Sequence, residues 1–294
     1  MQDSRQEIWT VGAILKTVAD FLGEKGCETP RLDAEVLLSH VLGANRISLY
    51  TGYDRPLLPR ELDDFREFVK RRAAGEPAAY LVGKKEFYSL EFSVGPGVLI
   101  PRPETEFLAA AAIDHAKCNR NSFVADLGTG SGCVAITLAV YVPGCEVIAV
   151  DRSGAAVECA RRNASSHDVQ DRVTVVEGDL FQPLERMNLS GKLDIIVANP
   201  PYISEAEFDK LHDSVRKYEP REALLAGRLG TEFHSLIVER SSAFLKKGGL
   251  LAVEAGAGQS ESICVAIRGR ADYGEPSTVE DYGGIKRIVA ARRV

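Results

Sequence analysis

Between Ser122 and the end of the chain, short runs of apolar, often β-branched residues alternate with segments whose apolar residues recur every three or four positions. The runs are typical of buried strands, and the periodic segments are typical of helices packed on a sheet. The predicted strands are residues 123–126, 146–151, 173–177, 193–198 and 249–254, and the predicted helices are residues 134–140, 155–165, 231–245 and 259–268. This alternation predicts an α/β fold whose mostly parallel sheet has helices on both faces.

Two further strands are predicted at the C-terminus, over residues 277–280 and 287–291, with Gly283-Gly284 between them. A glycine pair suits the tight turn between antiparallel strands. We therefore predict a terminal antiparallel hairpin at one edge of the sheet, an arrangement that is common in mostly parallel sheets.

The N-terminal quarter of the chain shows only the helical pattern. Apolar residues spaced by three, four and seven predict one helix after Thr10, a second after Thr29-Pro30 and a third over residues 59–73. Residues 1–75 are thus expected to form a small helical bundle. From these residues alone, a structural role and a role in recognition are equally open.

The connecting segment, residues 76–104, has a different character. Residues 86–94 are rich in aromatic and β-branched types, and Gly95-Pro96-Gly97 follows them as a turn. This pattern predicts a β-hairpin. The hairpin would link the bundle to an α/β domain over residues 105–294.

The composition argues against several classes of protein. The chain has 294 residues, of which 45% are hydrophobic and 27% are charged, as is ordinary for a soluble globular protein. No apolar run approaches the roughly 20 residues of a membrane-spanning helix, and the polar segment 1–7 lacks the apolar core of a signal peptide. The six cysteines are scattered without a Cys-x-x-Cys pair, which predicts reduced thiols and no zinc site. We therefore expect a cytoplasmic protein that binds neither a metal nor a membrane.

A glycine-rich segment, Asp126-Leu127-Gly128-Thr129-Gly130-Ser131-Gly132, lies where a predicted strand turns into a helix. Glycines there allow a tight turn and a close approach of the backbone to a ligand. The segment lacks the dinucleotide pattern Gly-x-Gly-x-x-Gly, because residue 133 is Cys, and it lacks the Gly-Lys-Ser/Thr of a P-loop. The segment therefore suits a ligand that has no pyrophosphate group to bind.

Three acidic residues follow three successive predicted strands. Asp151 ends the second strand, about 20 residues after Gly132, where an acid can accept hydrogen bonds from both ribose hydroxyls. Asp179 follows the third strand and can accept from the exocyclic amine of adenine, with Leu180 beside it. One such Asp would ordinarily be a cap or a turn residue, but three at one sheet edge indicate an adenosine ligand. S-adenosyl-L-methionine fits, with Asp126 and the glycines facing its amino-acid part.

The fourth predicted strand ends in Asn199-Pro200-Pro201-Tyr202. Proline has no N–H for the sheet ladder, so the strand must stop at the carboxyl edge of the sheet, where α/β sheets bind their ligands. The stiff backbone can hold the Asn199 side chain and the Pro200 carbonyl in a fixed arrangement beside the ring of Tyr202. Carbonyl oxygens accept hydrogen bonds from an –NH₂ group, so this corner predicts a site for a planar amine or amide.

These motifs resemble those of a known family. The glycine segment is similar to the first motif of class I S-adenosylmethionine-dependent methyltransferases, which implies their Rossmann-like sheet, and Asn-Pro-Pro-Tyr is similar to the motif of their amino-methylating branch. Residues 99–106 (Leu-Ile-Pro-Arg-Pro-Glu-Thr-Glu), 218–224 (Tyr-Glu-Pro-Arg-Glu-Ala-Leu) and 30–35 (Pro-Arg-Leu-Asp-Ala-Glu) resemble the PrmC/HemK family. The match spans nearly the whole chain. Its Pro-Arg-Pro-Glu-Thr-Glu segment is much more specific than Asn-Pro-Pro-Tyr, which DNA adenine methyltransferases share.

The resemblance implies an enzyme that methylates a protein. Members transfer the methyl group of S-adenosyl-L-methionine to the side-chain nitrogen (N5) of the glutamine in the Gly-Gly-Gln motif of bacterial class 1 peptide chain release factors, which supports translation termination and leaves S-adenosyl-L-homocysteine. We expect a monomer whose helical bundle and hairpin supply part of the release-factor docking surface. The residues expected to bind the cofactor are Asp126, Gly128, Thr129, Gly130, Ser131, Gly132, Asp151, Asp179, Leu180 and Asn199. The residues expected to bind the substrate are Asn199, Pro200, Pro201 and Tyr202, with catalytic roles for Asn199, Pro200 and Tyr202.

The expected catalysis is mainly positioning. A glutamine amide nitrogen is a poor nucleophile, because its lone pair is delocalised into the carbonyl group, whereas the sulfonium methyl group is already a strong electrophile. The Asn199 side-chain oxygen and the Pro200 carbonyl are expected to accept the two amide N–H bonds and to favour the positive charge that grows on the nitrogen. Tyr202 would pack against the amide plane. No general base is apparent.

Two other classes of function stay open. A nucleic-acid methyltransferase acting on adenine N6 or guanine N2 could bring a flipped base to the same corner. The net charge of −6 and the lack of a separate basic recognition domain argue against that class. A non-catalytic sensor of an adenosine ligand is the other class, but it would have no use for an amine-binding corner.

Overall fold

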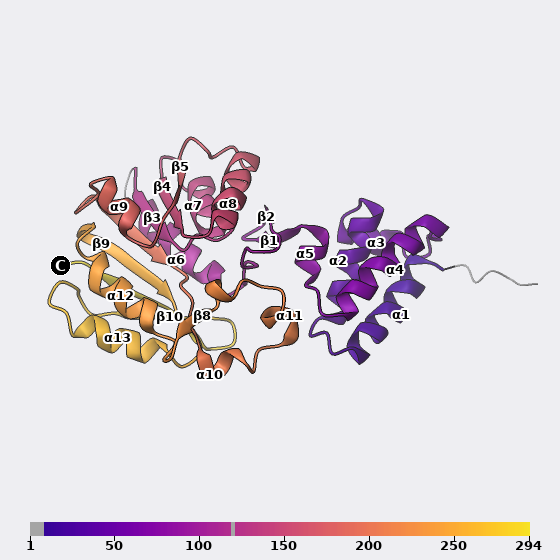
Figure 1. The fold of residues 1–294 in the computed structure, drawn as a ribbon. Helices are drawn as coiled ribbons and strands as arrows, with labels where there is room; N and C mark the ends of the chain where they lie inside the picture. The colour runs from indigo at the N-terminus through magenta and orange to yellow at the C-terminus, as the bar shows by residue number, and fades with distance from the viewer. Residues whose placement is uncertain (1–8, 119–120) are drawn as a thin grey trace, which may run out of the picture. The chain divides into compact units, whose positions relative to one another are not determined.

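The computed structural model describes residues 9–118 and 121–294, so the polar segment 1–7 lies outside the described residues. The described chain divides into two compact units (Figure 1). The helical unit contains the chain up to Gly83 together with Asp213–Tyr218, and the sheet unit contains Lys84–His212 and Glu219–Val294. The division into domains at residues 75 and 104 stays a prediction.

The helical unit contains the three predicted helices and additional short ones. The predicted helices are α1 (Val11–Glu24), α2 (Pro30–Leu42) and α4 (Pro59–Ala73), and the additional ones are α3 (Arg46–Thr51), α5 (Ala78–Val82) and α11 (Asp213–Arg216). The side chain of Thr10 caps α1 by accepting a hydrogen bond from the Ala13 N–H, as its position predicts. The short helices have too few residues for a periodic pattern to reveal them.

Two acids from the segment 30–35 are buried inside the helical unit. The Arg72 guanidinium donates to the Asp33 carboxylate at 2.8 Å, and both side chains are at most 10% exposed. The Glu35 carboxylate accepts from Arg31 at 2.7 Å and from Arg46 at 2.9 Å. These acids are therefore fixed by ion pairs within the helical unit.

The described residues of the sheet unit include one sheet of seven strands in the order β10-β11-β9-β6-β3-β4-β5. Its strands are β3 (Phe123–Leu127), β4 (Glu146–Asp151), β5 (Val173–Glu177), β6 (Leu193–Ala198), β9 (Leu245–Glu254), β10 (Ser277–Glu280) and β11 (Lys286–Arg292). The central pairs are parallel, and β11 runs antiparallel to both β9 and β10. The mostly parallel sheet and its antiparallel terminal hairpin are thus confirmed.

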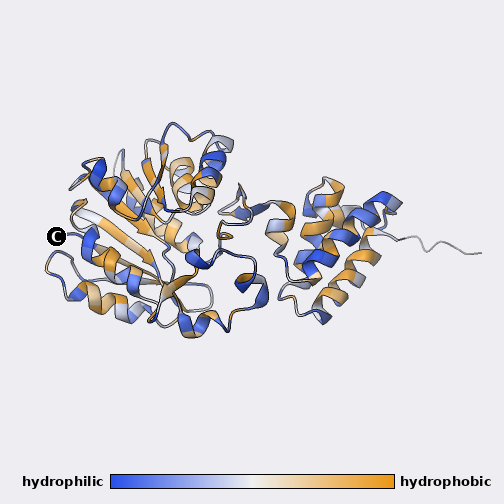
Figure 2. Ribbon diagram, in the orientation of Figure 1, coloured by the Kyte–Doolittle hydropathy of each residue, from blue (hydrophilic) through white to orange (hydrophobic). Residues whose placement is uncertain are grey.

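Helices cover both faces of this sheet. One face packs against α6 (Thr105–Lys117), α7 (Cys133–Tyr141) and α8 (Gly154–Ser166), and the other against α9 (Gln182–Arg186), α12 (Glu232–Ser241) and α13 (Ser260–Arg268). Successive strand residues alternate between the faces, so Val124 belongs to the first core and Ala125 to the second. The central strands are mostly orange in Figure 2, as expected for strands buried on both faces.

Among the described residues, four smaller elements of the sheet unit lie between β6 and α12. They are β7 (Ile203–Ser204) with the short helix α10 (Glu205–Phe208), the 3-10 helix η1 (Arg221–Ala223), and β8 (Leu225–Gly227), which pairs in parallel with β7. Within residues 9–118 and 121–294, none of the helices combines the length and the apolar character that crossing a membrane requires.

The predicted helix over residues 231–245 is wrong at its end. Helix α12 stops at Ser241, and β9 already begins at Leu245. The backbone of residues 243–245 pairs with the chain around the start of β6: the Gly191 N–H donates to the Ala243 carbonyl, and the Leu193 N–H donates to the Phe244 carbonyl. This pairing with a distant segment overrides the local helical pattern.

The β-hairpin exists, but its turn was predicted in the wrong place. Strands β1 (Lys84–Phe87) and β2 (Leu90–Ser93) are antiparallel, and the turn between them is Tyr88-Ser89, with φ angles of 51° and 60°. Two residues of positive φ give the turn that matches the twist of a hairpin. Because neither residue is glycine, the sequence pointed to Gly95-Pro96-Gly97, which follows the hairpin.

Candidate functional site

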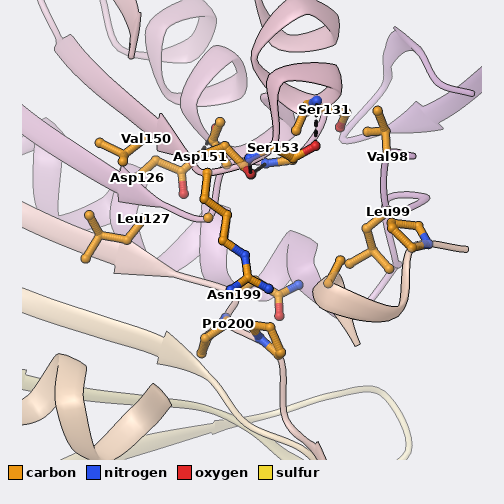
Figure 3. A pocket seen from close by; sticks show the side chains of 18 of the residues that line it. Val98, Leu99, Asp126, Leu127, Ser131, Val150, Asp151, Ser153, Asn199 and Pro200 are labelled. Carbon is orange, nitrogen blue, oxygen red and sulfur yellow. Dashed lines mark hydrogen bonds between the residues drawn. The ribbon is translucent and has the colours of Figure 1, made fainter. Parts of the chain in front are cut away.

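A cavity lies at the carboxyl ends of β3, β4 and β6, within the sheet unit. Figure 3 shows Asp151 and Ser153 on one side of it, Asn199 and Pro200 on another, and Val98 and Leu99 on a third. The residues that line it and were predicted from the sequence are Asp126, Gly128, Thr129, Gly130, Ser131, Asp151, Asp179, Leu180, Asn199, Pro200 and Pro201. Two predicted site residues, Gly132 and Tyr202, are not in the lining.

Asp126, the second-to-last residue of β3, is almost completely buried at 2% exposure. Its carboxylate accepts a hydrogen bond from the Thr129 hydroxyl at 2.6 Å. Burial raises the pKa of Asp126 to about 6, against the lowering effect of the Thr129 hydroxyl and the Ala135 N–H. The negative charge of Asp151 adds to the increase, so the cavity holds two interacting acids.

Asp151 ends β4 and is held by backbone groups. One carboxylate oxygen accepts from the Gly130 N–H at 2.8 Å, and the other accepts from the Ser153 N–H at 2.9 Å. Burial raises the pKa of Asp151 as well, and the charge of Arg152 lowers it. In the described part of the chain, no cation is among the groups that lower the pKa of Asp126. A positively charged ligand would therefore be favoured here.

Gly132 has a packing role. Its φ of +81° is in the left-handed region, and a Cβ there would lie 2.8 Å from the Ile136 side chain and 3.1 Å from Ala160. Only glycine lets α7 begin this close to α8. Its role in binding a cofactor stays a prediction.

The side of the cavity near Asp179 is partly apolar. Leu180 has a φ of 43° and packs partly against the core on the α9 face. Val98, Leu99 and Ala156 also line the cavity. Apolar side chains next to a carboxylate suit a flat, partly polar ring.

The Asn199 corner is held by a distant residue. Strand β6 ends at Ala198, as the two prolines predict. The Asn199 Nδ2 donates to the Thr105 Oγ1 at 3.0 Å. The nitrogen of an amide only donates, so the side-chain oxygen is the atom of Asn199 that can accept a hydrogen bond.

Tyr202 is turned toward β9. Its backbone carbonyl accepts from the Gln259 Nε2 at 2.8 Å, and a Cβ on Gly256 would lie 3.1 Å from its ring. Burial raises the pKa of the Tyr202 hydroxyl, and the nearby Glu254 raises it further. Its predicted contact with a substrate amide has no counterpart in the cavity lining and stays a prediction.

Other lining residues were missed from the sequence. They include Gly97, Val98, Leu99, Ile100, Pro101, Arg102, Thr105, Pro220, Glu222 and Ala223. Arg102 donates to the Glu219 carboxylate, which also accepts from the Ile100 N–H at 3.1 Å. The segments 99–106 and 218–224, which both carry the family resemblance, are thus joined in one wall of the cavity. The motifs themselves were the signal for this wall.

Among the described residues, no group of three or more His, Cys, Asp or Glu side chains is placed to hold a metal ion. The cavity lining offers carboxylates, guanidinium groups, carbonyl and amide groups, and apolar side chains.

Comparison with known proteins gives a consistent result. Residues 13–83 match the family model of the PrmC N-terminal domain, and residues 105–216 match that of the methyltransferase small domain. The chain is 42% identical over 288 residues to a release factor glutamine methyltransferase of Geobacter sulfurreducens, covering 98% of each chain. It is 40% identical over 290 residues to one of Chlorobaculum tepidum, covering 96% of this chain and 97% of the relative.

A solved structure shares the fold. The 16S rRNA N2 G1207 methyltransferase of T. thermophilus, in complex with AdoMet and guanosine, superposes with a TM-score of 0.52 at 19% identity. The similarity covers 72% of this chain and 50% of that chain. It supports the fold of the sheet unit.

Proposed function

This chain belongs to the family of release factor glutamine methyltransferases, and we propose that it methylates N5 of the glutamine in the Gly-Gly-Gln motif of bacterial class 1 peptide chain release factors. The protein is an S-adenosylmethionine-dependent methyltransferase. The observation that carries the proposal is the Asn199 corner. Its side-chain amide nitrogen is bound to Thr105, so an oxygen is left for a substrate N–H.

The cavity residues fit S-adenosyl-L-methionine. The two oxygens of Asp151 each accept one backbone N–H and keep further lone pairs for the ribose hydroxyls. Asp179 and Leu180 suit the adenine ring, and the buried Asp126 suits the cationic amino-acid part. When bound, the cofactor supplies an electrophilic methyl group on a positively charged sulfur.

The protein's own task is to orient the glutamine amide. The Asn199 Oδ1 and the Pro200 carbonyl would accept its two N–H bonds, and Pro200 and Pro201 would keep these acceptors rigid. Acceptors aimed at the N–H groups become stronger partners as positive charge grows on the nitrogen, so they favour the transition state over the ground state.

The proposal is tested with a radiolabelled methyl donor. The purified protein is offered a release factor, the same release factor with the Gly-Gly-Gln glutamine replaced by alanine, and DNA or RNA. Label on the native release factor alone is expected. Label on nucleic acid would indicate an adenine or guanine amino-methyltransferase, and no label on any acceptor would indicate a sensor.

The variant Asn199→Ala separates binding from chemistry. Loss of one aligned group that acts in the transition state is expected to reduce turnover by roughly 10²–10³-fold. The affinity for S-adenosyl-L-homocysteine should change by only a few fold, because Asp126 and Asp151 remain. Undiminished methylation by this variant would refute the role given to Asn199.

A further inference from the structure

The Asn199 corner of the cavity is rich in hydrogen-bond acceptors and poor in backbone donors. Prolines, which have no backbone N–H, line the cavity there at Pro101, Pro200, Pro201 and Pro220. The Asn199 Nδ2 is bound to Thr105, and the Ile100 N–H is bound to Glu219. A glutamine carboxamide presents two N–H donors and one carbonyl oxygen. The proposed acceptors bind the two donors, but the carbonyl oxygen also needs a donor when water is excluded.

Arg102 offers N–H groups at this corner. It lines the cavity with a side chain that is 29% exposed. Its Nη2 donates at 2.5 Å to Glu219, whose side chain is only 1% exposed. In the described part of the chain, Arg102 uses this one side-chain group to hold Glu219, so other N–H groups of the guanidinium are left for a ligand.

Arg102 and Asn199 are anchored on a common residue. The Arg102 carbonyl accepts from the Thr105 N–H at 3.1 Å, and the Thr105 hydroxyl accepts from the Asn199 Nδ2 at 3.0 Å. Pro101 and Pro103 lie on either side of Arg102, and the ring of each fixes its own φ angle. The segment therefore holds Arg102 in a fixed relation to the Asn199 corner.

The charge of Arg102 acts on the substrate side of the cavity. Burial raises the pKa values of Tyr202 and Glu254, and the charge of Arg102 lowers both. Tyr202 ends the Asn-Pro-Pro-Tyr segment, and Glu254 ends β9, which pairs with β6. Among the described residues, the groups that shift the pKa of Asp126 do not include Arg102. The guanidinium thus lies nearer to the Asn199 corner than to the acid assigned to the amino-acid part of the cofactor.

We propose that Arg102 donates to the side-chain carbonyl oxygen of the release-factor glutamine, while the Asn199 oxygen and the Pro200 carbonyl accept from its nitrogen. Arg102 is then a specificity-determining residue that selects a carboxamide. A side-chain ammonium group has no atom that could accept from it. This role rests on the proposed function, because it concerns the same glutamine. Binding both ends of the carboxamide fixes its plane and hence the direction of its nitrogen.

Glu219 makes such a donor compatible with methyl transfer. Positive charge grows on the glutamine nitrogen in the transition state, and an unbalanced cation close by would oppose it. The buried carboxylate of Glu219 balances the charge of Arg102, so the guanidinium contributes directed N–H groups with little net charge. Glu219 is thus a positioning residue that acts through Arg102.

A double-mutant cycle on binding tests the contact directly. The full chain with S-adenosyl-L-homocysteine bound is titrated by calorimetry with a release factor and with the same release factor whose Gly-Gly-Gln glutamine is replaced by alanine. Arg102→Met should weaken binding of the native release factor about tenfold or more, and should change binding of the alanine form by less than about twofold. Equal losses for both forms would show that Arg102 contacts another part of the release factor or only supports the cavity wall, and would overturn the proposal.

Turnover gives a second measure, with a matched control. Arg102→Met should lower kcat/KM for the release factor roughly 10–100-fold, and Arg102→Lys, which keeps the charge without the planar fork, should recover only part of it. Arg287 is also paired with a carboxylate, that of Asp281 at 2.8 Å, and its charge also lowers the pKa values of Glu254 and Tyr202. Among the described residues, however, Arg287 is not in the cavity lining. Arg287→Met should therefore keep a nearly normal kcat/KM, and equal losses in Arg287→Met and Arg102→Met would overturn the proposal.

Two further measurements exclude misfolding and a role in cofactor binding. If Arg102→Met does not fold, Arg102→Met/Glu219→Gln leaves no unpaired charge in the wall and should show the same coupling to the glutamine. The affinity for S-adenosyl-L-homocysteine should stay within a few fold of wild type in each variant. A large loss that is absent for 5′-methylthioadenosine, which lacks the amino-acid part, would show that Arg102 binds the cofactor carboxylate and would overturn the proposal.

Failure of the proposed function gives a different result. If the wild-type protein methylates no release factor, the proposed function fails, and the role of Arg102 fails with it. If the wild-type protein methylates the glutamine but the binding cycle shows no coupling between this glutamine and Arg102, only the role of Arg102 fails.

Discussion

The helical unit and the sheet unit both bury carboxylates, but they treat the negative charge differently. In the helical unit, Asp33 is paired with Arg72, and Glu35 is paired with two other arginines. In the sheet unit, Asp126 and Glu254 are at most 2% exposed, and burial raises their pKa values to about 6 and about 7. The helical unit thus pairs Asp33 and Glu35 with arginines, whereas the sheet unit leaves Asp126 and Glu254 incompletely compensated.

This difference separates acids with a structural role from acids that are available to a ligand or a proton. A buried acid that is paired with a guanidinium stays ionised and fixes two segments of chain together. A buried acid without a cation has a raised pKa and is ready to interact with a charged ligand or to take up a proton, which is typical of functional sites. The motifs that carry the family resemblance thus contain acids of both kinds. Only the burial of each acid and its charged partners distinguish the two kinds.

The largest effect is expected where a paired acid loses its cation. Arg72→Leu leaves Asp33 buried and unpaired, which should lower the free energy of unfolding of the helical unit by roughly 3–5 kcal/mol. The single tryptophan, Trp9, packs against the core of that unit, so its fluorescence during urea unfolding reports on this unit. The double variant Asp33→Leu/Arg72→Leu should recover most of the loss. Equal instability of both variants would contradict the pairing.

The next effect concerns Asp151, a cavity carboxylate that is held by backbone N–H groups. Asp151→Ala should weaken the affinity for S-adenosyl-L-homocysteine about 100-fold, since the proposed hydrogen bonds from the two ribose hydroxyls to this charged group are lost. Asp179→Ala, which removes one proposed bond at the rim of the same cavity, should cost about tenfold or less. Isothermal calorimetry measures both. A larger loss for Asp179→Ala would reverse the assignment of ribose and adenine.

A smaller effect, which stabilises the protein, is expected when Asp126 loses its charge. Its pKa is raised on folding from 3.8 to about 6, so stability is lost as the pH rises through this range. Asp126→Asn removes the buried charge and should increase the free energy of unfolding of the sheet unit by about 2 kcal/mol at pH 7. Calorimetric unfolding should show this gain at pH 7 and its disappearance near pH 4. A variant that is less stable than wild type at pH 7 would show that the carboxylate is well compensated.

The smallest effect is a pH dependence of cofactor binding. Protonation of Asp126 below its pKa of about 6 removes the charge that attracts the cationic amino-acid part of the ligand. The affinity for S-adenosyl-L-homocysteine should therefore fall about tenfold between pH 7.5 and pH 5. In Asp126→Asn the affinity should be weaker and nearly independent of pH. A wild-type affinity that does not change with pH would place the cationic group elsewhere.

Much of the fold could be predicted because its signals are local. Strands β4, β5 and β6 have the predicted bounds, since each is a short apolar run with polar or turn residues after it. The same holds for the cofactor side of the candidate site. The Thr129 hydroxyl bonds an acid three residues away, and the Ser153 N–H bonds an acid two residues away. Contacts of such short range are contained in the motif itself.

By itself, the sequence determined the parallel sheet, the terminal hairpin, the glycine turn with its acids and the strand end at Asn-Pro-Pro-Tyr. Only the tertiary structure decided the turn at Tyr88-Ser89, the early start of β9 and the walls of the cavity. It also decided which way Asn199 faces, through a hydrogen bond to Thr105, 94 residues away. The physical reason is range: periodicity and turn chemistry act between neighbouring residues, whereas burial and hydrogen-bond partners depend on segments that only folding brings together.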